Sequence, residues 1–268
     1  MTPQAVAHAA RSGLPLGLLI LAAALPATRP FVVAILIAGL AFTLRLGHPF
    51  RWAWAAPIPV TVVLCWGLLS SPLAAPTGAD CASLASPPAV WRATEATLAL
   101  MSLVLLAVVL RADRADLALR SPAPSVRWLA VVGAVILGPI GLLLGPALAR
   151  PFFGEIGLDL SQPGFIAPAL VFAVANGVME ELAYRGALLG WTARVTGPRV
   201  ALVGQAIVFG LAHAGPDVDG SPIVLMLALG LGGLLAGVIR LRTRSLLLPI
   251  AWHVALDLPL YVYLACPA

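Results

Sequence analysis

Residues 222–240 read PIVLMLALGLGGLLAGVIR, and the only charged residue among them is the final Arg240. An α-helix needs about 20 predominantly apolar residues to cross the hydrocarbon layer of a bilayer, because each residue advances the helix axis by about 1.5 Å. This stretch therefore predicts a helix that spans a membrane.

The composition extends this prediction to the whole chain. Of 268 residues, 61% are hydrophobic and 10% are charged, whereas soluble domains carry about 25% charged residues. The sequence predicts an all-α, polytopic transmembrane helical bundle of about eight or nine spans. The candidate spans are residues 13–28, 31–47, 52–74, 90–110, 128–149, 164–190, 199–215, 222–240 and 246–265. Two alternatives concern the start: the first two spans could form one hairpin, and residues 1–28 could be a cleaved signal peptide.

The positive net charge of +5 comes entirely from arginines, which are dispersed over the joints between the spans. They form no basic block or stripe, so we expect no nucleic-acid partner. If the spans alternate in direction, most arginines lie on one side, which the positive-inside rule assigns to the cytoplasm together with the N-terminus. The absence of lysine and the Ala/Pro-rich composition favour a bacterial cell (inner) membrane. The arginines on this side are Arg11, Arg45, Arg51, Arg111, Arg114, Arg120, Arg127, Arg194, Arg199, Arg240, Arg242 and Arg244.

The longest charged joint, residues 111–127, divides the chain into two predicted regions. Residues 1–127 form an N-terminal transmembrane region of about four spans plus this joint, and residues 128–268 form the region that holds the candidate site. Arg92 and Glu95 are the exceptional charges in the first region, and we expect them to be an anchoring ion pair near a membrane interface. The three cysteines have no metal-binding spacing, although Cys81 and Cys266 could pair on the outer side.

After residue 127, ionisable residues appear inside apolar spans. Placing such residues in the membrane costs free energy, and they are usually functional. In a helix, Glu181 and Arg185 lie one turn apart and can pair, which leaves Glu180 available as a general base. The alternative is a structural ion pair with a spare, protonated glutamate. His213 ends the next span at the same number of residues from Gly197 as Glu181, so a helical hairpin brings the two to similar depth.

The last span carries a third polar cluster. His253 and Asp257 are four residues apart and therefore point into the same sector of a helix. Three segments thus deliver Glu, His or His/Asp groups to depths that could coincide. This favours a functional site over scattered helix-packing hydrogen bonds.

Three motifs occur in sequence order: Glu180-Glu181-x-x-x-Arg185, Phe209-x-x-x-His213 and His253-x-x-x-Asp257. In this order they resemble the CAAX protease and bacteriocin-processing (CPBP) family of intramembrane proteases. That family includes type II CAAX prenyl endopeptidases and bacterial Abi proteins. The resemblance covers about residues 128–265. It implies that the protein hydrolyses a peptide bond of a membrane-associated or prenylated protein or peptide. It also implies roles for the site residues. Glu180, assisted by His213, would activate water; His253 and Asp257 would orient or stabilise the oxyanion; Arg185 would hold Glu181; and Phe209 would contact substrate.

The resemblance leaves the cofactor and one alternative open. Glu180, His213 and His253 are candidate zinc ligands, but the chain lacks the His-Glu-x-x-His helix of many zinc proteases. Zinc and a metal-free Glu/His mechanism are therefore both open. The alternative functions are a non-catalytic membrane scaffold, a bacteriocin-immunity protein or a small proton-linked transporter.

Overall fold

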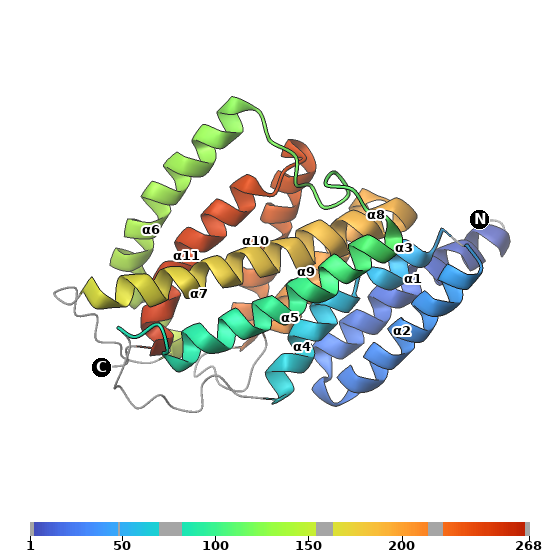
Figure 1. Cartoon of the computed structure of the whole chain (residues 1–268), viewed down its shortest axis with the longest axis horizontal. Helices are drawn as coiled ribbons and strands as arrows, with labels where there is room; N and C mark the ends of the chain where they lie inside the picture. Colours follow the sequence, from blue (N-terminus) through green and yellow to red (C-terminus); the bar gives the residue numbers. More distant parts are fainter. Residues whose placement is uncertain (1–2, 48, 70–81, 154–162, 214–221, 266–268) are drawn as a thin grey trace.

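The computed structural model describes residues 3–47, 49–69, 82–153, 163–213 and 222–265. The secondary-structure elements within these ranges are all helices, which confirms the all-α prediction (Figure 1). They are α1 (Pro3–Ala24), η1 (Pro26–Thr28), α2 (Arg29–Arg45), α3 (Arg51–Ala55), α4 (Ile58–Leu69), α5 (Pro87–Leu110), α6 (Pro124–Phe153), η2 (Pro163–Phe165), α7 (Ile166–Glu180), η3 (Glu181–Leu188), α8 (Leu189–Thr196), α9 (Pro198–Ala212), α10 (Pro222–Thr243) and α11 (Leu247–Ala265).

Many of these helices have the length and apolar character of membrane spans. In the described part of the chain, five helices are long enough to cross, namely Pro26–Arg45, Pro87–Leu110, Pro124–Gly141, Ile166–Thr196 and Pro222–Thr243. Shorter apolar helices cover Gly13–Ala24, Pro198–Ala212 and Leu247–Val262. Large apolar side chains such as Val108, Trp128 and Leu143 are exposed on the outside of the bundle, as expected for surfaces that face lipid. The protein is therefore an integral membrane helical bundle.

Prolines set where several helices begin. α5, α6, α9 and α10 each start with a proline, whose fixed φ suits the first helical position and whose missing N–H has no partner there in any case. Gly197 precedes α9 with φ of +86°, a conformation that only glycine adopts without strain. The joint of the predicted helical hairpin thus lies at Gly197, between α8 and α9.

The main hydrophobic core joins both predicted regions. Leu16 and Leu19 of α1 and Leu103 of α5 belong to the same buried cluster as Tyr184 and Trp191. A Cβ on Gly204 of α9 would lie only 2.4 Å from the Leu16 side chain, so the glycine permits close α1–α9 packing. The core therefore runs across residue 127, and the proposed division into two regions stays a prediction.

The arginine-rich joints gather at one end of the bundle. Arg194 at the end of α8 forms an ion pair with Asp116 of the α5–α6 joint at 2.8 Å, and its guanidinium lies 4.1 Å from the ring centre of Trp52. The same joint accepts a hydrogen bond at its Ala118 carbonyl from the Leu246 amide at 3.0 Å. Joints predicted to share a membrane side thus lie together. The assignment of that side to the cytoplasm stays a prediction.

The possible pairing of Cys81 with Cys266 falls outside the described residues. Cys65 of α4 is a half-buried free thiol.

Candidate active site

The glutamate pair lies at the centre of the longest apolar segment. Ile166–Thr196 comprises 31 residues, and Glu180 and Glu181 near its middle are 5% and 1% exposed. Two carboxylates this deep in a bundle require partners, because an uncompensated buried charge costs several kcal/mol. The contacts of Glu181 and Glu180 therefore define the site.

The backbone changes form at this point. Residues Glu181–Leu188 form the π-helical segment η3, in which each hydrogen bond spans one residue more than in an α-helix. The predicted span over residues 164–190 and the predicted Glu181–Arg185 pair are both present, although the helix is π-helical over these eight residues. Such insertions are rare and occur frequently at functional sites. η3 packs against α4, α5, α9 and α10, so neighbouring helices hold it in this form.

Arg185 neutralises one carboxylate, as the sequence predicts. Its Nη1 lies 3.0 Å from Glu181 Oε1, and both side chains are almost completely buried. The guanidinium also lies 4.1 Å from the ring centre of Phe209, and the edge of that ring meets Tyr184 at 5.0 Å between centroids. Arg185 is thus held between a carboxylate and an aromatic face, which favours a cation.

His253 of α11 connects the carboxylates. Its Nδ1 lies 2.8 Å from Glu181 Oε1, while its Nε2 lies 3.6 Å from Glu180 Oε2 and 3.5 Å from Asp257 Oδ2. Asn176 donates a hydrogen bond from Nδ2 to Asp257 Oδ2 at 2.8 Å. Since an ionised carboxylate only accepts hydrogen bonds, the Nδ1 of His253 carries a proton. The imidazole then faces two further carboxylates with its other nitrogen.

A glycine brings the two helices of this site together. A Cβ on Gly177 of α7 would lie 2.9 Å from Val254 Cγ2 and 3.1 Å from the Val254 amide nitrogen. Gly177 precedes the glutamate pair and Val254 follows His253 in sequence. Its missing side chain therefore sets the close α7–α11 approach that places His253 against Glu181.

His213 takes a different position. It follows the end of α9, and its Nδ1 donates to the Phe209 carbonyl at 2.7 Å. Its ring contacts the Phe209 ring at 4.7 Å, and the same ring lies 6.3 Å from His253. Within the described chain, His213 makes no hydrogen bond or ion pair with Glu180. Its assisting role stays a prediction, as does substrate contact by Phe209.

The described residues do not fit a zinc site. Among them, no group of three His, Cys, Asp or Glu side chains is arranged to hold a metal ion. Of the candidate ligands, Glu180 and His253 are neighbours, whereas the described contacts of His213 are with Phe209 and with neither of these two residues. We therefore assign no reaction step to a metal.

Sequence reasoning missed the position of the Arg92–Glu95 pair and the role of Asn176. The Arg92–Glu95 ion pair forms as predicted, but Glu95 is 2% exposed and lies inside the bundle. Asn176 was recognisable as a polar residue four positions before Glu180 on an apolar helix. Its partner Asp257 could not be read from the sequence, because the contact joins residues 81 positions apart.

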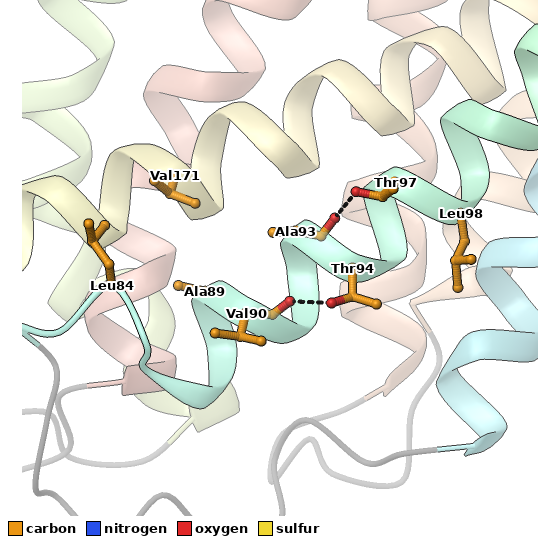
Figure 2. A pocket seen from close by; sticks show the side chains of 8 residues that line it. All are labelled: Leu84, Ala89, Val90, Ala93, Thr94, Thr97, Leu98 and Val171. Carbon is orange, nitrogen blue, oxygen red and sulfur yellow. Dashed lines mark hydrogen bonds between the residues drawn. The ribbon is translucent and has the colours of Figure 1, made fainter.

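A shallow apolar groove lies outside this polar cluster. Figure 2 shows α5 beside α7, with Ala93, Thr97 and Val171 among the lining residues. The groove has a volume of about 370 Å³. Thr94 and Thr97 donate their hydroxyls to carbonyls of their own helix, those of Val90 and Ala93 (Figure 2). The groove therefore presents no free polar group, and the site chemistry lies on the buried side of α5.

These features define a polytopic helical membrane protein with a buried cluster of three carboxylates, an imidazole and a guanidinium. Residues 162–259 match the family model described as type II CAAX prenyl endopeptidase Rce1-like, which confirms the resemblance suggested by the three motifs. The match is narrower than the predicted range of about 128–265 and includes all the predicted site residues. It supports a CAAX-type intramembrane endopeptidase at the level of the family. No curated protein and no solved structure matches the chain.

Proposed function

We propose that the protein is an intramembrane endopeptidase that hydrolyses a peptide bond of a membrane-associated or prenylated protein, with Glu180 as the general base. One observation carries the assignment. Glu180 Oε2 is buried without a hydrogen-bond partner in the described chain, 3.6 Å from the imidazole of His253. Glu181 also has an unpartnered oxygen, Oε2, but its Oε1 is engaged by both Arg185 and His253. The free oxygen of Glu180 is thus beside a potential proton donor.

In the proposed hydrolysis, water is the nucleophile and Glu180 carries its proton. Glu180 takes a proton from a water molecule, and the oxygen of that water bonds to the scissile carbonyl carbon. The carbonyl oxygen becomes an oxyanion, which the Nε2–H of the charged His253 stabilises. The intermediate collapses with cleavage of the C–N bond, and the proton held by Glu180 passes to the leaving amine. Asp257, held by Asn176, keeps His253 oriented.

His213 is proposed to assist Glu180 through its second nitrogen. Because Nδ1 donates to the Phe209 carbonyl, the Nε2 of the neutral ring is an acceptor. An acceptor at this position could take a hydrogen bond from water as Glu180 removes its other proton. Arg185 is proposed to act indirectly, because its positive charge compensates Glu181 and leaves Glu180 as the reactive carboxylate.

The location is also a proposal. We place the protein in a bacterial cell membrane with its N-terminus in the cytoplasm. The gathering of Arg194, Asp116 and Leu246 at one end of the bundle supports a shared side for the arginine-rich joints.

Cleavage assays test the function. Detergent-purified wild type and the variants Glu180→Gln, His213→Ala and His253→Ala are incubated with a library of farnesylated and unmodified membrane peptides, and products are identified by mass spectrometry. We expect cleavage by the wild type and its loss in all three variants, with insertion unchanged. Asp116→Asn removes a carboxylate at the end of the bundle and serves as the matched control, with activity retained.

The outcomes separate the possibilities. Retained cleavage in a variant would remove that residue from the mechanism. No cleavage of any peptide by folded wild type would favour the immunity, scaffold or transporter alternatives. A parallel incubation with a zinc chelator decides whether a metal takes part.

A further inference from the structure

The N-terminal helices contribute a charged pair that faces the site. Arg92, Glu95, Ala96 and Ala99 recur on α5 with spacings of three and four, so they form one stripe of the helix. The Ala96 and Ala99 part of this stripe is buried against Met179, the residue before Glu180. The α5 stripe therefore packs on the part of α7 that carries the glutamate pair.

The contacts of Arg92 extend this packing. Its guanidinium lies 5.4 Å from the ring centre of Phe172 on α7, and Asn176 lies one helical turn beyond Phe172. Arg92 Nε and Asn176 Oδ1 are both buried without a hydrogen-bond partner in the described chain. Asn176 itself holds Asp257. Polar groups thus continue from the α5 pair toward the His253 cluster.

The two charges of the pair lie near different carboxylates. Glu95 adjoins Ala96, which is buried against the residue before Glu180. Arg92 lies one turn earlier, against Phe172, and Phe172 is one turn before the Asn176 that holds Asp257. The pair is therefore a dipole whose negative end is the nearer one to the proposed base. In a bundle interior charges are screened far less than in water, so reversing the pair would change the electrostatic potential at both carboxylates.

We infer that the Arg92–Glu95 pair is a positioning element of the active site, so that the site is completed by a helix outside the family-matched residues 162–259. This inference rests on the proposed peptidase function. Both residues act through Glu180 and Asp257 and need not touch substrate. If the pair only anchored α5, positions 92 and 95 would need opposite charges, but it would not matter which position carried the positive one.

Reversing the pair separates these roles. The variant Arg92→Glu/Glu95→Arg keeps an ion pair on α5 but places the positive charge toward Glu180. We expect kcat to fall at least about tenfold, equivalent to about 1.4 kcal/mol of barrier, with KM and thermal stability close to wild type. The variant Arg92→Gln/Glu95→Gln removes both charges and should show a smaller fall in kcat. Reversal of the Asp116–Arg194 pair at the end of the bundle is the matched control, with kcat unchanged.

Three results would overturn the inference. Wild-type kcat in the reversed variant would show that the pair only anchors α5. A fall in kcat equal to that of the Asp116–Arg194 reversal would show a general effect of charge reversal. If the reversed variant does not fold, wild-type kcat in Arg92→Gln/Glu95→Gln overturns the inference equally. Failure of the proposed function is a separate result, because folded wild type would then cleave no peptide, or Glu180→Gln would cleave as well as wild type.

Discussion

Replacing Arg185 by methionine should unfold the protein at a markedly lower temperature. Arg185 and Glu181 are both 1% exposed, so the substitution leaves Glu181 buried with His253 as its remaining partner. Breaking a buried ion pair from one side costs about 3–5 kcal/mol. For a chain of this size, that cost corresponds to a fall in Tm of roughly 10 °C.

A double variant tests the cause of this loss. Glu181→Gln/Arg185→Met removes both charges and keeps an oxygen that accepts the proton of His253 Nδ1. We expect most of the lost stability to return, because replacing both partners of a buried pair is often close to neutral. Cleavage should stay impaired, since the electrostatic arrangement around Glu180 is not restored.

The assay is thermal unfolding in detergent, followed by tryptophan fluorescence, alongside peptide cleavage. Arg194→Met is the control, because the Arg194 side chain is 44% exposed and surface pairs contribute about 0–1 kcal/mol. The reasoning is refuted if Arg185→Met unfolds at the wild-type temperature, or if the double variant is as unstable as the single one.

Two further substitutions examine helix packing. Gly177→Ala should push α11 away from α7 and lower kcat about tenfold or more, equivalent to about 1.4 kcal/mol of barrier. Gly232→Ala is the control and should leave kcat unchanged, because a Cβ there meets nothing within 4 Å. Equal kcat values in the two variants would contradict the packing argument. Gln205→Leu should cost about 1–3 kcal/mol in unfolding free energy, because it leaves the Gly233 carbonyl without its donor at 2.9 Å. Its kcat should stay at the wild-type level, and a loss of kcat without a loss of stability would show that Gln205 belongs to the site.

Much of this architecture was predictable from local sequence signals. Each predicted apolar segment overlaps a helix, because length and hydrophobicity alone specify a span. The Glu181–Arg185 pair and the approach of His253 to Asp257 follow from spacings of four residues. These are relations within one helix, which periodicity describes well.

Relations between helices were less accessible. The π-helical form of Glu181–Leu188 depends on the four helices packed against it, and no residue in ELAYRGAL signals it. Equal distances from Gly197 predicted similar depth for His213 and Glu181, but not that the His213 side chain binds the Phe209 carbonyl four residues earlier on its own helix. Glu95 looked like an interfacial charge because the sequence does not show that α7 covers it.

The position of His253 on α11 also has a consequence during synthesis. His253 lies 72 residues after Glu181 in the chain. At ribosomal rates of about 5–20 residues per second, the glutamates emerge roughly 4–14 seconds before their histidine partner. During that interval the nascent chain holds the proposed base without the group that stabilises its reaction. Hydrolysis by the proposed mechanism would therefore begin only after the helix that carries His253 has been made and has joined the others in the bilayer.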